Sequence, residues 1–416
     1  MRIPSPRKAL IGVLAVAIVA ALGGPAGAGG KAPAEVPGFD GDTINLGVIT
    51  PLSGRVSVIG NPLTAGNEMW WEYYNEEEGG IAGKYPVELL QEDSAYAPPT
   101  AVQAYDKIKG DVVAFQQVLG TQVTQALLPK MQADQAVAAP ATLDATWVHN
   151  PNLVPVGAPY QVEAINALDY YVNNGGEGTK VCALAQDDEF GEAGLEGLAA
   201  AKKALKLKTG PSPRFRTGED LTAQIQELAD ADCEAVLVVA TAADASAIMT
   251  TSVSLNFEPR YVALAPFWLP LFKDSANISE FMVEHLWVAA GQFVAWGDST
   301  IPGMDQFIER QETYAPDQAP DPYFVFGYLQ GQAMAQVLER AVKNGDLSRA
   351  GVLKAVSQVK KLTFDGLDDD YKYGAAAKRN PPRATAVLGI DPANVVGLTI
   401  VAPQTASAGA KKFKIE

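Results

Sequence analysis

The chain has few of the residues on which catalysis and metal binding most often depend. Its 416 residues include only two cysteines and two histidines. His149 and His285 lie far apart in the sequence, so these four side chains give no metal-ligand spacing. The GxSxG, HExxH and GxGxxG motifs are also absent from the sequence. We therefore predict that the protein is not an enzyme and uses no cofactor and no metal.

Basic residues are also scarce. The 32 Lys and Arg residues face 48 Asp and Glu residues, which gives a formal net charge of −16. Proteins that bind nucleic acids need clustered Lys and Arg to neutralise phosphates. The composition therefore argues against a nucleic-acid partner and favours an acidic surface that keeps the protein dispersed.

Long apolar runs are missing except at the N-terminus. There, Arg2, Arg7 and Lys8 precede the small and apolar run 9–22, and Ala26-Gly27-Ala28 resembles a cleavage site. We predict a signal peptide at 1–28 and a linker at 29–41, and hence a periplasmic or other extracytoplasmic location. The alternative is an uncleaved anchor, although the run is short for a spanning helix. No cysteine follows the segment directly, so the sequence predicts no lipoprotein anchor.

The two cysteines stand at the starts of two predicted strands. Cys182 lies in the apolar run 181–185, and Cys233 precedes the run 235–240. If these strands are parallel neighbours, both cysteines lie near the same edge, and an exported protein permits a disulfide. The alternative is two separate buried thiols.

Short apolar strands alternate with helices twice along the chain. The first unit is the apolar strand 44–49, a loop of small residues at 53–61, and a helix that ends near Gly79-Gly80. Similar units continue to about residue 143, and a second series occupies about 160–290. This pattern predicts an α/β fold with two similar lobes, each built on a parallel sheet.

Ligands of open α/β sheets bind beyond the carboxyl ends of the strands. Each predicted lobe has three loops in that position, and we expect a ligand held between the lobes to touch them. The helix N-terminus after Thr121 offers free N–H groups that suit a carboxylate. The loops are 53–61, 120–122, 140–144, 187–191, 240–243 and 265–268.

Several stretches resemble the periplasmic branched-chain amino acid binding proteins of ABC transporters, the type I leucine/isoleucine/valine-binding family. The resemblance covers about 43–401 and is clearest in Ile-Thr-Pro-Leu-Ser-Gly at 49–54, Glu-Glu-Gly-Gly-Ile-Ala-Gly at 77–83 and Gln-Asp-Asp-Glu-Phe-Gly-Glu at 186–192. It implies two Rossmann-like lobes joined by a three-segment hinge, with crossings near Val156-Gly157, Ala290-Gly291 and Asp365–Asp370.

The resemblance also implies the domain boundaries. We expect lobe 1 to comprise 42–156 and 292–365, and lobe 2 to comprise 157–291 and 366–403. Residues 404–416 remain as a polar tail.

The resemblance also implies which residues contact the ligand, and we assign them position by position in this sequence. The resemblance implies that the loop at Thr121 holds a carboxylate, and Phe190 stands where a Tyr usually packs on the ligand. Amino acid binders of the family have an acid where this chain has Ala265, so leucine is a poor candidate ligand. The predicted ligand-binding residues are Ile59, Thr121, Gln122, Thr142, Leu143, Phe190, Thr241, Ala265 and Trp268.

Together these observations predict a monomeric solute-binding protein that delivers a small carboxylate-bearing molecule to the permease and ATPase subunits of an ABC importer. The ligand is expected to be branched-chain amino acid-like or an apolar or aromatic carboxylate. One alternative is a ligand sensor of the same fold that reports to a receptor or regulator. Another is a hydrolase that uses Asp187, Asp188 and Glu189, although a solvated acidic loop explains that cluster more simply. Asp144 and Asp188 are expected to face solvent rather than to replace the acid missing at Ala265.

Overall fold

The computed structural model describes residues 36–176 and 178–415. The predicted signal peptide and the first part of the predicted linker lie outside these residues. The rest of the linker is structured, because Val36 forms a β-bridge with Phe39, which in turn bridges to Ile44. The description below concerns the compact unit that begins at Val36.

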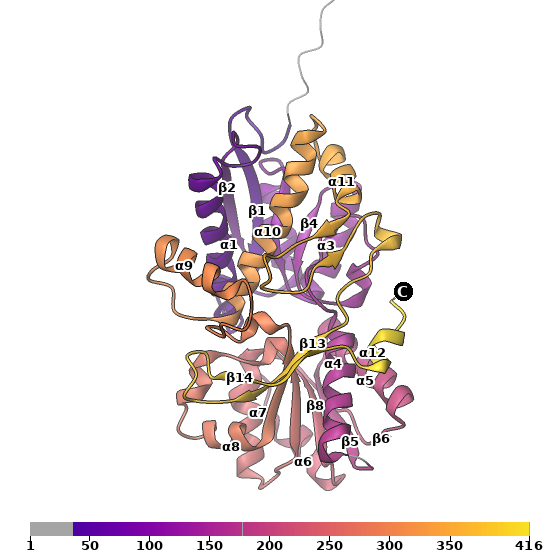
Figure 1. Cartoon of the computed structure of the whole chain (residues 1–416). Helices are drawn as coiled ribbons and strands as arrows, with labels where there is room; N and C mark the ends of the chain where they lie inside the picture. Colours follow the sequence, from indigo (N-terminus) through magenta and orange to yellow (C-terminus); the bar gives the residue numbers. More distant parts are fainter. Residues whose placement is uncertain (1–35, 177, 416) are drawn as a thin grey trace, which may run out of the picture. The chain divides into compact units, whose positions relative to one another are not determined.

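Lobe 1 is built on a parallel sheet with the strand order β2-β1-β3-β4 (Figure 1). Helix α10, which comes much later in the chain, packs along α1 and completes this lobe. The strands are β1 (Ile44–Thr50), β2 (Val87–Asp93), β3 (Ala114–Leu119) and β4 (Ala138–Ala141). The helices are α1 (Ser57–Glu77), α2 (Pro98–Ile108), α3 (Thr121–Ala133), η1 (Ala145–Trp147), α9 (Met304–Tyr314), α10 (Pro322–Lys343) and α11 (Arg349–Gln358).

Lobe 2 is built on a larger sheet with the order β14-β13-β10-β9-β8-β5-β6, and β7 also pairs with β5. Its strands are β5 (Lys180–Gln186), β6 (Lys208–Thr209), β7 (Arg214–Phe215), β8 (Ala235–Val239), β9 (Arg260–Leu264), β10 (Leu286–Ala290), β13 (Thr385–Ile390) and β14 (Leu398–Thr405). The helices of this part of the chain are α4 (Tyr160–Tyr171), η2 (Val172–Gly176), α5 (Glu189–Leu205), α6 (Thr222–Asp230), α7 (Ala242–Ser254), η3 (Ala265–Phe267), η4 (Pro270–Asp274), α8 (Ser279–His285) and η5 (Gln292–Val294).

The central strands of both sheets are covered on both faces, which explains their continuous apolar sequences. All residues of β3 and β8 are buried, and β1 pairs in parallel with β2 and β3. Strands β13 and β14 differ from the others because they join the sheet in antiparallel orientation. The two-lobed α/β architecture with parallel sheets confirms the fold class predicted from the alternating pattern.

The three expected crossings between the lobes lie close together in space. A Cβ atom placed on Gly157 would lie 3.9 Å from Oδ2 of Asp368, and one on Gly291 would lie 3.5 Å from Oδ1 of the same carboxyl group. Asp368 thus occupies the centre of the connecting region. Strands β11 (Lys361–Leu362) and β12 (Tyr371–Lys372) form a separate antiparallel pair beside it.

The C-terminal segment is more ordered than the polar tail that we expected at 404–416. Strand β14 continues to Thr405, and helix α12 (Ala408–Lys412) packs on α4 and α5. The small side chain of Ala410 is fully buried there, and the Arg383 guanidinium donates to the Ala410 and Phe413 carbonyl oxygens. The short run Ala408-Gly409-Ala410 in an otherwise polar stretch gave no clear periodic signal for this helix.

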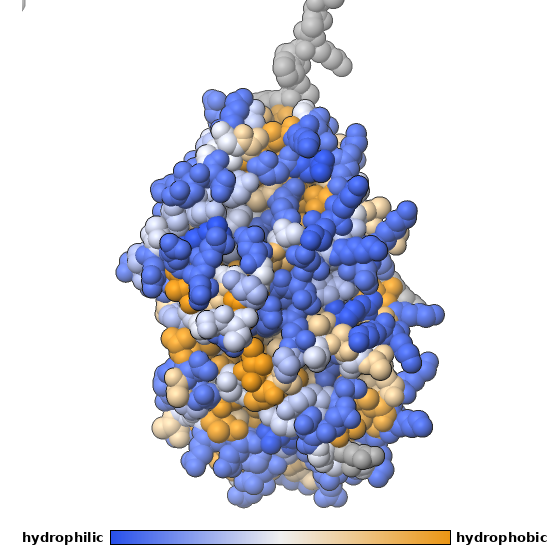
Figure 2. Space-filling model, viewed as in Figure 1, coloured by the Kyte–Doolittle hydropathy of each residue, from blue (hydrophilic) through white to orange (hydrophobic). Residues whose placement is uncertain are grey.

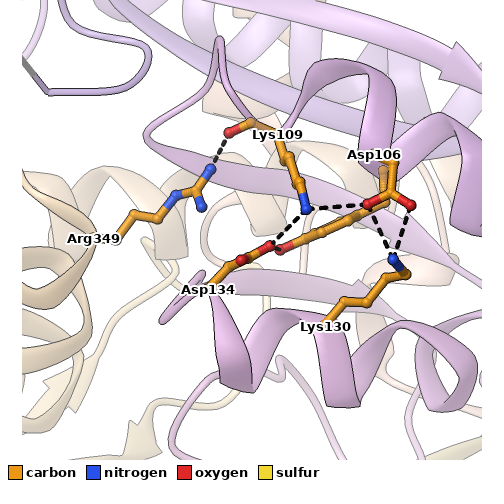
Figure 3. A network of polar contacts seen from close by, with 6 residues as sticks. Asp106, Lys109, Lys130, Asp134 and Arg349 are labelled. Atoms are coloured by element: carbon orange, nitrogen blue, oxygen red, sulfur yellow. Dashed lines mark hydrogen bonds and ion pairs between the residues drawn. The ribbon is translucent and has the colours of Figure 1, made fainter.

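A polar network holds the outer helices of lobe 1 together (Figure 3). The Lys130 ammonium lies 2.8 Å from the Asp106 carboxylate, and Lys109 pairs with Asp106 and Asp134 at 3.1 and 3.3 Å. Hydrogen bonds from Lys130 and Lys109 lower the pKa of Asp106. Arg349 donates to the Lys109 carbonyl oxygen and so ties the start of α11 to the end of α2. The network supports the lobe at a distance from the cavity described below.

Hydrophilic residues predominate on the face of the molecule that Figure 2 shows. Figure 2 shows hydrophobic residues as scattered patches among hydrophilic ones on this face. In the part of the chain that the structure describes, we find no helix with the length and apolar character needed to cross a membrane.

Candidate functional site

A cavity lies between the two lobes, at the carboxyl ends of their strands. About 660 Å³ of space free of protein atoms lies within it and at its mouth, open solvent included. Both lobes contribute to its wall, and so do segments that are remote in the sequence, such as η5 and the start of α10. The lining residues are Ile59, Leu63, Tyr96, Leu119, Gly120, Thr121, Ala141, Thr142, Leu143, Tyr160, Phe190, Thr241, Ala265, Pro266, Phe293, Val294, Pro322, Tyr323 and Phe326.

Most residues that the sequence pointed to line this one cavity. They are Ile59, Thr121, Thr142, Leu143, Phe190, Thr241 and Ala265. Gln122 instead lines an outer pocket in the cleft, where its side chain donates to the Tyr96 carbonyl oxygen at 3.3 Å. Trp268 is buried elsewhere, because its indole N–H donates to the Val396 carbonyl oxygen at 2.8 Å and its ring packs on Phe272. Its place in the chain was near the cavity, but its side chain belongs to the core of lobe 2.

Several helices begin at the cavity wall. The wall residues Thr121, Tyr160 and Pro322 are the first residues of α3, α4 and α10, and Phe190 is the second residue of α5. Thr241 stands directly before α7, without a capping bond from its side chain. The first N–H groups of a helix have no intrahelical partner, and the helix dipole places partial positive charge there. This arrangement favours an anion in the cavity.

The N-terminus of α3 differs from the others in having no acidic neighbour. In α4, α5 and α7 an acidic residue lies in the first turn, and Asp321 caps α10. Helix α3 begins after Gly120 and has neither an acidic first turn nor a side-chain cap. Its N–H groups are therefore the best placed to accept an external anion.

Three hydroxyl groups lie together beside this helix start. Thr121 Oγ1 and Thr142 Oγ1 are 2.6 Å apart and share a hydrogen bond. Burial raises the pKa of Tyr160, and contacts from the Thr142 hydroxyl and the Leu143 backbone oppose that rise. The phenol therefore stays neutral and can donate. Together with the α3 N–H groups, these hydroxyls form the polar end of the cavity.

Thr241 contributes a further hydroxyl from lobe 2. Its backbone N–H donates to the Gln186 side chain at 2.6 Å. Its Oγ1 is buried, and among the described residues it has no hydrogen-bond partner. Buried polar groups nearly always have a hydrogen-bond partner. A ligand in the cavity can supply the partner that this hydroxyl lacks.

The cavity wall carries no formal charge. Among the residues that line it in the described part of the chain, none is Asp, Glu, Lys or Arg. The acid nearest to Ala265 is Glu163 on α4, which is 1% exposed and accepts a hydrogen bond from the Ala265 N–H at 3.3 Å. Burial raises the pKa of Glu163 to about 8, so at neutral pH this group is largely uncharged. It lies behind the wall and does not line the cavity.

The expectation that Asp144 and Asp188 face solvent is wrong for Asp144. This carboxyl group is 8% exposed and accepts hydrogen bonds from the Thr146 N–H and hydroxyl, both at 2.9 Å. Asp188 is partly buried and caps α5 by accepting from the Gly191 N–H at 3.0 Å. Both acids serve local turns and caps, because an Asp before a helix satisfies a free N–H group. Neither lines the cavity.

Some wall residues were missed by sequence reasoning. The aromatic and apolar ones come mainly from the turn after β2, from α4 and from the segments that follow the second crossing. An aromatic residue at a helix start carries no signal that separates a wall from a core position. They are Leu63, Tyr96, Leu119, Tyr160, Phe293, Val294, Pro322, Tyr323 and Phe326.

The described residues show no arrangement for metal chemistry. Within 36–176 and 178–415, no three His, Cys, Asp or Glu side chains gather in a group that could hold a metal ion. The polar groups of the cavity are hydroxyls and backbone N–H groups, which bind and orient but do not by themselves form a nucleophile and a base.

Comparison with known proteins identifies the family. A family model described as periplasmic binding protein matches residues 43–393, which is most of the chain. The chain belongs to the periplasmic binding protein family. This confirms the resemblance to type I solute-binding proteins. No curated protein matches the chain significantly.

Solved structures of this family share the fold. A fatty acid ABC transporter substrate-binding protein from Thermomonospora curvata is 23% identical, with a TM-score of 0.84 over 92% of this chain and 97% of that chain. A branched-chain amino acid ABC transporter protein from Thermus thermophilus, solved with bound valine, is 19% identical, with a TM-score of 0.73 over 89% and 98% of the two chains. A substrate-binding protein from Aeropyrum pernix is 16% identical, with a TM-score of 0.77 over 89% and 98%. These likenesses concern the fold.

Proposed function

We propose that the protein is an extracytoplasmic solute-binding protein that encloses an apolar carboxylate without an α-amino group and delivers it to an ABC importer. The observation that carries this proposal is the uncharged cavity onto which several helix N-termini converge. The family membership supports a binding role without covalent chemistry, and the ABC transporter proteins among the structural relatives support the importer.

The carboxylate group of the ligand is held at the polar end. Free N–H groups of α3 and the hydroxyls of Thr121, Thr142 and Tyr160 supply neutral donors, which are effective where water is excluded. Apolar residues of α1, η5 and α10 surround the rest of the ligand. Such a wall with a few placed polar groups is the usual composition of a small-molecule site.

An α-ammonium group would find no partner charge. An unpaired buried charge is costly, since its hydration is lost without compensation. Ala265 supplies no acid, and the carboxyl of Glu163 is turned to the Ala265 N–H behind the wall. A fatty acid, which is what the Thermomonospora curvata protein is named for, lacks this ammonium group.

Calorimetry with matched ligands tests the proposal. Hexanoate, decanoate and phenylacetate should bind with micromolar or tighter affinity, whereas leucine, isoleucine and valine should bind weakly or not at all. Decanamide, which keeps the chain but lacks the charge, is the control for the carboxylate and should bind more weakly than decanoate. Micromolar binding of leucine with no binding of the amine-free acids would contradict the proposed ligand class.

Small-angle scattering supplies a second measurement. If the lobes close around the ligand, decanoate should reduce the radius of gyration of the protein. An unchanged radius at saturating decanoate would count against closure.

A further inference from the structure

Tyr96 lies between the cavity and the open cleft. It lines the interlobe cavity and also the outer pocket, which is formed by Arg55, Gln122 and the segments 186–188 and 215–217. Of the residues that the structure describes, Tyr96 alone lines both the cavity and this outer pocket. Its side chain is therefore the partition between bound ligand and solvent on this side.

The backbone that carries Tyr96 is held in an unfavourable conformation. Ala95 and Tyr96 have φ angles of 46° and 57°, in the left-handed region that side chains other than glycine rarely adopt. Hydrogen bonds fix the turn, because Asp93 Oδ1 accepts from the Ala95 N–H at 2.7 Å and Ser94 Oγ accepts from the Tyr96 N–H at 3.2 Å. Such local strain concentrates at functional positions because the surroundings must maintain it.

The aromatic ring lies directly on the start of α3. A Cβ atom on Gly120 would be 2.7 Å from Tyr96 Cε2, so any larger residue at position 120 would displace the ring. Gly120 also has a φ of 107°, and it immediately precedes Thr121 at the polar end of the cavity. The ring thus lies against the residue that precedes α3, next to the helix start to which we assign the carboxylate.

We propose that the Tyr96 ring is the gate of the cavity, which retains the ligand and excludes water from the α3 N-terminus. This inference rests on the proposed function. The ring acts by its bulk, while its hydroxyl reaches lobe 2 beside the Gln186 amide and stays protonated, because burial and the nearby Asp188 raise the pKa of Tyr96. Gln186 in turn holds the Thr241 N–H, so the gate lies against a fixed part of lobe 2.

The test is the rate of ligand release. Protein loaded with tritium-labelled decanoate is chased with excess unlabelled decanoate. Tyr96→Gly removes the ring and suits the left-handed backbone, and it should release decanoate roughly tenfold faster or more, since changes in related complexes appear mainly in the dissociation rate. Tyr96→Phe keeps the ring and should release decanoate at nearly the wild-type rate.

Arg216→Ala is the matched control. Arg216 lines the outer pocket but not the cavity, so its loss should leave the release rate unchanged. Equal rates for wild type and Tyr96→Gly would overturn the gate, and so would Tyr96→Phe releasing as fast as Tyr96→Gly. Thermal unfolding of each variant checks that the fold is retained.

A second experiment uses no carboxylate ligand. It therefore tests the gate independently of the proposed function. If the wild-type protein binds no decanoate, the proposed function fails. The gate is then tested by a thiol on the cavity wall, introduced as Thr241→Cys in a chain whose two native cysteines are bonded to each other. N-Ethylmaleimide should modify this thiol faster when Tyr96→Gly is added. Equal modification rates with and without Tyr96→Gly would overturn the proposal that Tyr96 is a gate.

Discussion

The hydroxyl of Tyr323 lies 2.9 Å from the carbonyl oxygen of Pro266 and donates to it, although the two residues belong to different lobes. The Trp268 carbonyl oxygen lies at 3.0 Å from the same hydroxyl. Tyr323 lies in the first turn of the helix α10 of lobe 1, and Pro266 lies in η3, which directly follows β9 of lobe 2. Contacts of α3 with α5 and of α1 with α7 also join the lobes. The structure therefore represents a closed arrangement in which Tyr323 bridges the cleft.

Removal of this bridge should weaken ligand binding. A single hydrogen bond contributes about 0.5–1.5 kcal/mol net, so Tyr323→Phe should weaken decanoate binding by up to about tenfold. Calorimetry measures the affinity. Tyr328→Phe is the control, because Tyr328 is a buried tyrosine of the same helix whose hydroxyl pairs with Arg310 within lobe 1. Equal losses in the two variants would show that the bridge has no special part in closure.

The unpartnered hydroxyl of Thr241 leads to a second prediction. Replacement by valine removes a buried polar atom that lacks a partner in the described structure, so Thr241→Val should stabilise the unliganded protein by about 1 kcal/mol. The same change should weaken binding of a ligand that uses the hydroxyl. Thermal unfolding without ligand and calorimetry with decanoate measure the two effects.

Thr124 provides a matched control for this variant. Its hydroxyl is also buried and has no partner among the described residues, but Thr124 does not line the cavity. Thr124→Val should therefore stabilise the protein without a change in affinity. If Thr241→Val destabilises the unliganded protein, the hydroxyl has a structural partner such as a bound water.

The bond between Cys182 and Cys233 leads to a third prediction. Their Cα atoms are 5.8 Å apart at the amino ends of the neighbouring strands β5 and β8, and the bond closes a long loop, with a sequence separation of 51 residues. A disulfide of this kind typically contributes about 2–4 kcal/mol. The double variant Cys182→Ala/Cys233→Ala should lose stability by this amount in urea unfolding.

Two observations accompany the disulfide prediction. Denatured, unreduced protein should show no free thiol, and two free thiols per chain would contradict the bond. Decanoate affinity should be unchanged in the double variant, because the ligand cavity lies at the opposite ends of these strands.

The strand pattern was sufficient to predict the fold class and most of one cavity wall. Thr121, Thr142 and Thr241 each stand within two residues of the end of a buried strand. The carboxyl ends of parallel strands meet at one edge of a sheet. Their common location therefore follows from local sequence and topology. The side of the cavity formed by α10 does not, because Tyr323 and Phe326 reach it only through packing of a remote helix.

The positions of some side chains depend on tertiary packing, which the residue type alone does not reveal. Trp268 is one residue of a predicted wall loop, yet its indole finds the Val396 carbonyl in the core. Tyr96 follows an edge strand of lobe 1, and only its left-handed backbone turns the ring onto Gly120. No periodic pattern in the sequence predicts either of these side-chain positions.

Glu163 leads to the last prediction, which concerns pH. Burial raises the pKa of Glu163 to about 8 from its ordinary value of 4.5; the Ala265 N–H opposes this rise, and the charge of Asp368 makes a smaller contribution to it. The folded protein therefore holds a proton that the unfolded chain has lost between about pH 4.5 and pH 8. Because the folded state binds more protons, the free energy of unfolding falls as pH rises through this window. The stabilisation is fully present below about pH 4.5 and is lost as pH passes about 8.

Glu163→Gln should remove this dependence. The glutamine oxygen can still accept from the Ala265 N–H, but the group no longer ionises, so the variant should gain a few kcal/mol relative to wild type as pH rises from about 5 to about 8. Urea unfolding at a series of pH values measures the difference.

The two proteins must be compared at each pH, because burial also raises the pKa values of Asp321 and Asp368, each to about 7, in both proteins. Glu88→Gln is the control, since Glu88 is exposed on the edge strand β2 and its replacement should leave the pH profile close to that of wild type. If wild type and Glu163→Gln have parallel profiles, Glu163 is ionised in the folded protein, and a buried carboxylate beside Ala265 would then be available to pair with an ammonium group.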